Sequence, residues 1–239
     1  MIEYRVKETV KEPMKHESQN AAVLNAPAPG SGGRWAAGED PAKRHQILEG
    51  AKRVFMKMGF DAASMNDVTR EAGVSKGTLY VYFANKEDLF AAMMESERTY
   101  FVNLVRNALS DEADVTTSLY DFGIVFVTHV TSDKTISAMR TVIGVRERMP
   151  SLCQRFFTGP ENLRTVLRGF LERQAAIGHL KIDDFDMAAR HFLEMASGGY
   201  FKLRLFGDME EPPSKEEIDY VVRGAVRVFL AGYGPDRRD

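Results

Sequence analysis

The sequence contains a single cysteine, Cys153, and this scarcity excludes two kinds of site. One thiol cannot form a disulfide within the chain, and it cannot supply the several sulfur ligands of a cysteine-based zinc site. A lone thiol is also typical of proteins from a reducing compartment. Two interpretations of Cys153 stay open at this point, a redox sensor and a buried, inert side chain, and we favour the second.

Long apolar runs and a strong net charge are also absent. No apolar segment approaches the roughly 20 residues that span a membrane. The N-terminal residues MIEYRVKETVKEP are charged and contain no signal-peptide core, so we expect a cytoplasmic protein. The formal net charge is −2, and nucleic-acid binding would therefore need basic residues concentrated in one region. The histidines lack the short paired spacings of a zinc site, and we expect no metal and no cofactor.

The first 39 residues differ in composition from the remainder of the chain. The segment AAVLNAPAPGSGGRWAAGED is rich in Ala, Pro, Gly and Ser and shows no helical periodicity, which is typical of a flexible tail. The sequence GSGG within it lacks the lysine and the spacing of a phosphate-binding loop, and indicates a linker. We expect tails at residues 1–39 and 234–239.

Residues 40–86 carry closely spaced start and stop signals for helices. Asp40 and Pro41 are suited to begin a first helix, whose apolar side chains recur on one face until Gly59. Gly59 is itself suited to a left-handed C-terminal cap. Further N-terminal caps are expected at Ser64, Ser75 and Asn85, with a stop at Gly73.

The run TLYVYF, residues 78–83, is ambiguous because its residue types favour β-strands. Leu79 and Phe83 are four residues apart, so in a helix they share one face and can anchor it to its neighbours. The flanking caps also favour a helix. Two short helices joined by a tight glycine-containing turn predict a helix-turn-helix, whose second helix, about 76–83, enters the DNA major groove.

The other side chains of this second helix suit contacts to DNA. Lys76 and Lys86 can pair with phosphates, and tyrosine hydroxyls can donate hydrogen bonds to phosphate oxygens. Thr78 and Val81 can touch base edges. Gly77 costs about 1 kcal/mol relative to Ala inside a helix, and its missing side chain allows a close approach to a phosphate backbone. The alternative for Tyr80 and Tyr82 is that both are core aromatics.

Helical patterns continue from residue 86 to the end of the chain. The breaks carry Pro and Gly, and the sequence shows no internal repeat and no convincing strand pair. We expect an all-α fold, with a three-helix helix-turn-helix DNA-binding domain at 40–86 and a larger helical-bundle domain for effector binding and dimerisation at 87–233. The predicted helices are 86–109, 115–130, 134–148, 161–177, 184–206 and 215–231, with a helical turn at 151–158.

The segment KRHQILEGAKRVFMKMGFDAASMNDVTREAGVSKGTLYVYFANKEDLFAAM resembles the DNA-binding domain of the tetracycline-repressor (TetR) family. The segments RERMPSLCQRFFTGPENLRTVLRGFLERQAAIGHL and DDFDMAARHFLEMASGGYFKLRLFG are similar to the C-terminal domain of its AefR-like branch. The resemblance implies a ligand-responsive repressor that binds a palindromic operator as a homodimer and is released by a small molecule. Carried over position by position, it implies DNA contacts by Ser64, Arg70, Ser75, Lys76, Gly77, Thr78, Tyr80, Tyr82 and Lys86.

The effector pocket and the dimer interface are less sharply indicated. A dimer is required to read two half-sites, and the last two long helices offer apolar or small side chains, each of which could equally be core: Phe192, Met195, Gly199, Val221, Val222, Ala225 and Phe229. Arg140 could meet an anionic ligand or pair with Glu172 or Glu194. The candidate pocket residues, which could also be ordinary core, are Phe122, Phe126, His129, Met139, Arg140, Phe170, His191 and Met195.

The alternative function is an all-helical enzyme or ligand carrier without specific DNA binding. No local nucleophile motif supports catalysis, and we expect no catalytic residue. The basic, tyrosine-rich character of residues 76–86 favours the regulator.

Overall fold

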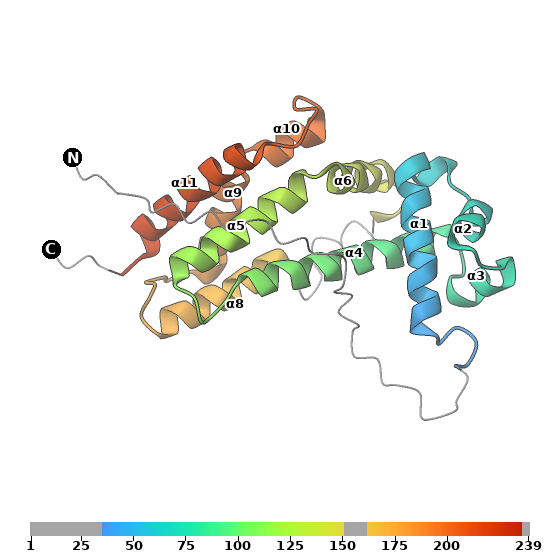
Figure 1. Cartoon of the computed structure of the whole chain (residues 1–239), viewed down its shortest axis with the longest axis horizontal. Helices are drawn as coiled ribbons and strands as arrows, with labels where there is room; N and C mark the ends of the chain where they lie inside the picture. The colour runs from blue at the N-terminus through green and yellow to red at the C-terminus, as the bar shows by residue number, and fades with distance from the viewer. Residues whose placement is uncertain (1–34, 151–161, 236–239) are drawn as a thin grey trace, which may run out of the picture. The chain divides into compact units, whose positions relative to one another are not determined.

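The computed structural model describes residues 35–150 and 162–235, and every structural statement below concerns these residues. Every described helix lies within the unit Ala37–Asp239. Within the described ranges the regular secondary structure is α-helical, as the sequence predicted (Figure 1). The expected tails lie mostly outside the described residues, and the expected turn at 151–158 and Cys153 lie wholly outside them.

The N-terminal helices are α1 (Pro41–Ala62), α2 (Met65–Ala72) and α3 (Lys76–Tyr82), followed by the long helix α4 (Lys86–Ala108). Each of these helices begins where the sequence predicted a cap. A side-chain oxygen accepts a hydrogen bond from a backbone N–H of the first turn at Asp40, Ser64, Ser75 and Asn85. TLYVYF is therefore helical up to Tyr82, because these local hydrogen bonds satisfy the helix ends and outweigh β propensity.

Two glycines set the path of this region. Gly73 ends α2 in the left-handed conformation with φ 65° and ψ 38°, and its N–H donates to the Thr69 carbonyl. Gly59 has φ 76° and ψ 168°, so it interrupts α1 before a last turn that ends at Ala62. A side chain at either position would be strained, because a positive φ brings Cβ too close to the backbone.

The C-terminal helices are α5 (Val115–Thr131), α6 (Asp133–Val145), α8 (Leu163–Ala176), α9 (Phe185–Ser197), α10 (Tyr200–Phe206) and α11 (Lys215–Tyr233). The prediction of one helix over 184–206 was wrong. Gly198 and Gly199 have φ values of 55° and 83° and separate α9 from α10. Gly198 also lies so close to α11 that an added Cβ would be 2.4 Å from Val221 Cγ2. No helix in the described ranges is long and apolar enough to cross a membrane.

Two hydrophobic cores organise these helices. The larger core joins α5, α8, α9 and α11, and its phenylalanines pack ring against ring, as Phe192 and Phe229 do at 5.4 Å between centroids. The smaller core holds α1, α2 and α3 together with the first turns of α4. It also contains Val142 and Val145 of α6, so the helix-turn-helix does not close its own core but shares it with two helices of the second domain.

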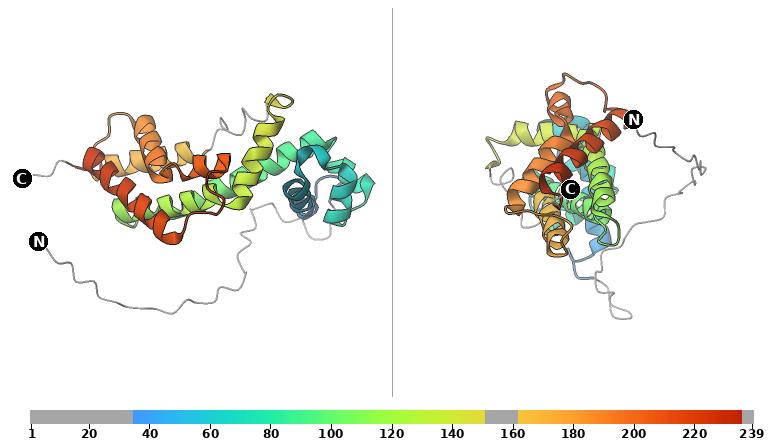
Figure 2. Two further views of the ribbon diagram at one scale, coloured as in Figure 1. Left: turned by 90° about the horizontal axis from the view of Figure 1, so that it is seen from above. Right: turned by 90° about the vertical axis from the view of Figure 1, so that its left-hand side faces the viewer.

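Helix α4 connects the two cores. It runs from beside α1 to α5 and α8 (Figures 1 and 2). Helix α6 also packs against α1, and α10 packs against both α5 and α6. Helices α4 and α6 are therefore the helices of the C-terminal bundle that pack most extensively against α1 of the DNA-binding domain.

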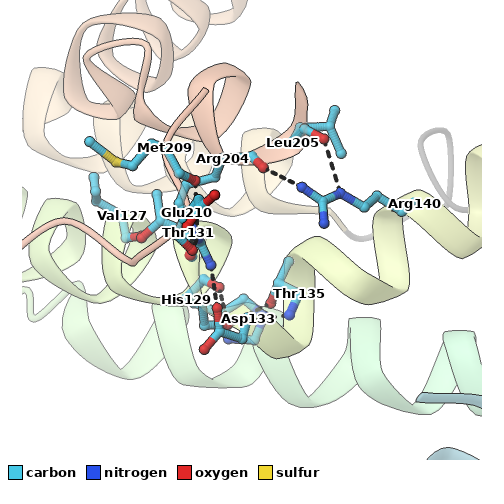
Figure 3. Close-up of polar contacts among 11 residues, drawn as sticks. Val127, His129, Thr131, Asp133, Thr135, Arg140, Arg204, Leu205, Met209 and Glu210 are labelled. Atoms are coloured by element: carbon cyan, nitrogen blue, oxygen red, sulfur yellow. Dashed lines mark hydrogen bonds and ion pairs between the residues drawn. The ribbon is translucent and has the colours of Figure 1, made fainter. Parts of the chain in front are cut away.

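Arg204 of α10 is buried, with 3% of its surface exposed, and holds α10 against the corner between α5 and α6 (Figure 3). Its Nε donates to the Thr131 carbonyl at 3.0 Å and its Nη1 to the Met209 carbonyl at 3.1 Å. It also contacts the Glu210 carbonyl and the Asp133 carboxylate. Each of the three nitrogens of this buried guanidinium thus donates to an oxygen, which offsets the cost of burying the charge.

Candidate nucleic-acid interface and ligand cavity

Helix α3 is anchored by two side chains and turns the others outward. Leu79 and Phe83 are buried, at 0% and 3% exposure, as their spacing predicted. Tyr80 and Val81 are exposed by 45% and 52%. The alternative of Tyr80 as a core aromatic was therefore wrong. Tyr82 is half-buried, and its hydroxyl donates to the Asp40 carbonyl at 3.3 Å.

Five exposed residues and the half-buried Thr78 form one surface, here called the α3 outward face: Ser75, Lys76, Gly77, Thr78, Tyr80 and Val81. The Ser75 Oγ accepts the Thr78 N–H at 3.0 Å and lies 2.8 Å from the Thr78 hydroxyl. The Lys76 Nζ lies 5.9 Å from the centroid of the Tyr80 ring. The face thus combines two hydroxyls, an ammonium and a phenol. All of these groups can donate hydrogen bonds to phosphate oxygens.

Gly77 lies in open space on this face. A Cβ added there would meet only the Ser75 Oγ, at the comfortable distance of 3.8 Å. Its φ is not positive, so nothing in the fold requires a glycine at this position. Alanine would therefore fit at this position without strain.

The remaining DNA-contact candidates have their polar groups already engaged within the domain. Arg70 is exposed, and its Nη2 pairs with Asp67 at 2.6 Å. The Ser64 hydroxyl caps α2. The Lys86 Nζ donates to the carbonyls of Phe60 and Ala63 at 2.8 and 3.0 Å, so in this structure it closes the end of α1.

Close packing of α1 against α2 fixes the orientation of the α3 outward face. A Cβ added at Gly50 of α1 would lie 2.6 Å from the Cβ and 2.8 Å from the Cα of Ala72. The Gln46 Nε2 donates to the Ala72 carbonyl at 2.7 Å, and Arg53 pairs with Glu71 at 2.5 Å. The close contact at Gly50 was not predicted from the sequence. The apolar stripe of α1 does not distinguish this glycine from an ordinary helical residue.

A cavity of about 330 Å³ lies where the helix-turn-helix meets the C-terminal bundle. Seven helices contribute to its walls, from α1 to α10. The volume lies at the lower end of the range for small-molecule sites. The walls are mainly apolar, with Met56, Met93, Phe101, Met139, Leu193 and Phe201 among the lining residues.

Of the pocket candidates from the sequence, His129 and Met139 line this cavity. Phe122, Phe126 and Phe170 are buried in the larger core, and Met195 packs against it. The His191 Nδ1 lies 2.7 Å from the Tyr233 hydroxyl. Arg140 donates from Nε and Nη2 to the carbonyls of Leu205 and Arg204 at 3.0 and 2.8 Å (Figure 3), so the alternative of a pairing with Glu172 or Glu194 was wrong.

The polar part of the cavity wall includes an ion bridge between three helices. Glu97 of α4 accepts from Lys52 of α1 and lies 3.1 Å from the Lys134 Nζ of α6. Burial opposes ionisation of Glu97, but the two lysines outweigh it and hold the pKa of this carboxyl below its usual range. Burial lowers the pKa of Lys134, and the nearby Lys52 ammonium lowers it further. Sequence reasoning missed this bridge because its members are far apart in the chain.

His129 adds a flat, uncharged surface to the cavity. Its ring stacks on Phe101 with centroids 3.8 Å apart and an interplanar angle of 8°. Burial lowers the pKa of His129 to about 4, and the Lys134 ammonium acts in the same direction. The imidazole is therefore neutral near pH 7 and does not contribute to the charge of the cavity wall.

The residues expected at a dimer interface lie mostly inside the chain. Phe192, Val222, Ala225 and Phe229 are buried in the larger core. Met195 and Val221 are half-buried, and Gly199 separates α9 from α10. The outward surface of α11 instead presents other residues at helical spacing, namely Tyr220, Arg223, Arg227, Val228 and Ala231.

Two family models match this chain. Residues 47–93 match the model of bacterial regulatory proteins of the tetR family. Residues 117–235 match the C-terminal domain of AefR-like transcriptional repressors. The first match contains α2 and α3, and the second runs from within α5 through α11.

Individual relatives agree with these matches. The chain is 25% identical to IcaR of Staphylococcus epidermidis, a negative transcriptional regulator, over 78% of this chain and 98% of that protein. It spans 40% of the length of YvdT and 26% of YfiR, both from Bacillus subtilis, at 34% and 41% identity. It spans 33% of the activator FasR of Mycolicibacterium smegmatis at 38% identity.

Solved structures share the fold. The flavonoid-responsive regulator FrrA has a TM-score of 0.69 and 29% identity, with coverage of 82% of this chain and all of that chain. A TetR-family regulator from Pseudomonas syringae has a TM-score of 0.62 at 24% identity, with coverage of 81% and 98%, and at that identity it supports the fold alone. The helix-turn-helix, the helical bundle and the two family matches together show that this chain belongs to the TetR family of transcriptional regulators, with a C-terminal domain of the AefR-like type.

Proposed function

We propose that this protein is a ligand-responsive transcriptional repressor that binds a palindromic operator through the α3 outward face. The observation that carries the proposal is the composition of that face. An exposed lysine, two hydroxyls and a tyrosine surround a glycine that the fold does not require. A helix of this kind, presented by a helix-turn-helix, matches the geometry of a major-groove reader.

The proposed DNA contacts divide by chemistry. Lys76, Ser75 and Tyr80 suit phosphate contacts, and Thr78 suits a base edge. Val81 is exposed and apolar, so its contact is limited to groups such as a thymine methyl. Ser64 and Arg70 on α2, together with Tyr82 and Lys86, border the face and are proposed to position α3 and to reach the flanking phosphates.

We infer that the protein acts as a homodimer, because a palindromic operator presents two half-sites about 34–36 Å apart. The interface proposed here uses α9 and α11, which pack together along one side of the bundle. On α11, Tyr220 and Val228 are large and exposed, and nothing lies within 4 Å of a Cβ built at Gly224 between them. This surface replaces the buried residues that the sequence suggested.

The cavity is the proposed effector site, and its position supplies a mechanism. Its walls include Lys52 and Met56 of α1, so a ligand there contacts the helix-turn-helix directly. A ligand that fits a conformation in which the two α3 helices are wrongly spaced draws the population away from the operator-bound state. FrrA is a flavonoid-responsive regulator of the same fold, which supports a small-molecule effector for this chain.

Repression is the proposed sign of regulation, and the proposed location is the cytoplasm. The C-terminal domain matches a model of repressors, and IcaR is a negative regulator. FasR, an activator, is matched over a shorter segment of this chain.

The proposal is tested by the salt dependence of binding to DNA from upstream of the protein's own gene. Replacement of Lys76 by Ala (K76A) removes one phosphate contact. We expect it to weaken binding and to reduce the slope of log K against log salt by roughly one unit. Fluorescence anisotropy over a range of salt concentrations measures both quantities.

Lys215→Gln is the matched control, because Lys215 is an exposed lysine at the start of α11, outside the α3 outward face. Its slope should equal that of the wild type. A wild-type protein that binds this DNA no better than unrelated DNA would contradict the proposal for that operator.

A further inference from the structure

Basic side chains outnumber acidic ones among the described residues of the cavity wall. Among the described lining residues, Lys52, Arg98, Lys134 and Arg164 are basic, and Glu97 supplies the single carboxylate. Further acids lie nearby but do not line the cavity. Glu49 lies 3.7 Å from Lys52, Glu95 pairs with Arg98, and Asp186 pairs with Arg164.

Among the basic lining residues, Lys134 has the weakest ion pair with an acidic residue of the chain. Its Nζ shares Glu97 with Lys52, and Lys52 is the closer partner of that carboxylate. Its side chain is half-exposed, whereas that of Lys52 is 17% exposed. An anion that enters the cavity can therefore form a charge-assisted hydrogen bond with the Lys134 ammonium. This strong bond offsets the loss of the contact between Lys134 and Glu97.

The rest of the cavity suits an apolar body of limited size. Met56, Met93, Phe101, Met139, Leu193 and Phe201 line it, and the stacked ring of His129 is uncharged near pH 7. A ligand that fills such a cavity gains by removing apolar surface from water. Among the described lining residues, a cationic molecule would meet four basic side chains and a single carboxylate, Glu97, which is already paired.

We propose that the cavity takes a small organic anion, an apolar body with one carboxylate, and that Lys134 binds this carboxylate in exchange for Glu97. The exchange opens the link between α4 and α6, while Lys52 of α1 stays paired with Glu97. Because α4 and α6 both pack against α1 of the DNA-binding domain, the ligand then changes the connection between that domain and the bundle. This regulatory consequence rests on the proposed function, whereas the class of ligand does not.

The test uses three probes with the same apolar body: phenylbutyrate, phenylbutanol and phenylbutylamine. Isothermal titration calorimetry on the full chain measures their affinities. We expect phenylbutyrate to bind roughly tenfold or more tightly than phenylbutanol, since a hydrogen bond to a charged group contributes enough for that ratio, and phenylbutylamine to bind most weakly.

Two substitutions at the bridge should change this preference in opposite directions. Lys134→Gln should remove the advantage of phenylbutyrate over phenylbutanol. Glu97→Gln removes the internal competitor for Lys134 and should raise the affinity for phenylbutyrate. Lys215→Gln is the control, an exposed lysine outside the cavity, and should leave all three affinities unchanged.

The result that overturns the ligand class is a phenylbutyrate affinity no greater than that of phenylbutanol, or a preference that survives Lys134→Gln. Failure of all three probes to bind at millimolar concentration overturns it as well. Operator binding is measured separately on the same preparations. Tight binding of phenylbutyrate without release of operator DNA would leave the ligand class intact and would contradict the regulatory step.

Discussion

Gly77→Ala is expected to weaken operator binding about tenfold or more while slightly raising the stability of the fold. A Cβ at this position meets only the Ser75 Oγ at 3.8 Å, so alanine fits without strain. Replacing glycine by alanine at a compatible position stabilises a protein by about 0.4–1 kcal/mol. On DNA, the added methyl group would hold the backbone of α3 away from the phosphates, and each lost charge-assisted hydrogen bond costs about 1.5–3 kcal/mol.

Gly50→Ala is the matched substitution in the same domain and should behave differently. Its Cβ would lie 2.6 Å from the Ala72 Cβ and 2.8 Å from the Ala72 Cα, and the backbone of α2 must move to accommodate it. Overpacking of this kind costs about 1–3 kcal/mol. We therefore expect Gly50→Ala to lose both stability and operator affinity.

Chemical denaturation and DNA titration of the two variants distinguish the two roles. Loss of affinity with an unchanged or higher free energy of unfolding assigns Gly77 to the DNA interface. If Gly77→Ala binds operator DNA like the wild type, the close approach of α3 to the phosphate backbone is contradicted. If Gly50→Ala is as stable as the wild type, the close packing of α1 on α2 is contradicted.

Arg204→Met is expected to destabilise the fold by about 3 kcal/mol, because it leaves the buried Thr131 carbonyl and two part-buried carbonyls without a donor. The Thr131, Met209 and Glu210 carbonyls each accept from this guanidinium. Methionine can fill the volume of the arginine stem, so packing is largely retained. Urea denaturation followed by circular dichroism should show a lower midpoint with an unchanged slope.

Arg140→Met provides the comparison. Arg140 of α6 is exposed, and it donates to the carbonyls of Arg204 and Leu205 of α10 (Figure 3). Its expected cost is about 1 kcal/mol. Equal losses of stability in the two variants would contradict the role assigned to the buried guanidinium of Arg204.

Local signals made the N-terminal half predictable from the sequence. The caps at Ser64, Ser75 and Asn85 each bond to a backbone group within three residues, so the information is contained in a few neighbouring letters. The spacing of Leu79 and Phe83 likewise settled the conformation of TLYVYF. The break at Gly198 and Gly199 was also readable, because two consecutive glycines inside a helix cost about 1 kcal/mol each.

The cavity could not be predicted, because its walls come from seven helices. Lys52 and Glu97 are 45 residues apart, and only the packing of α1 on α4 brings them together. Met93, Glu97 and Phe101 do recur at helical spacing on one face of α4, but the same spacing is expected of an ordinary core stripe. The phenylalanines that the sequence suggested for the pocket instead fill the larger core, since nothing local distinguishes a filled interior from a cavity.

The central claim is that two copies of this chain read DNA through α3, and hydroxyl-radical footprinting on DNA upstream of its own gene tests it most directly. The account predicts two protected segments on one face of the duplex, centred about one helical turn apart, and loss of both with Gly77→Ala at the same protein concentration. Protection of a single segment, or none above that seen on unrelated DNA, would contradict it.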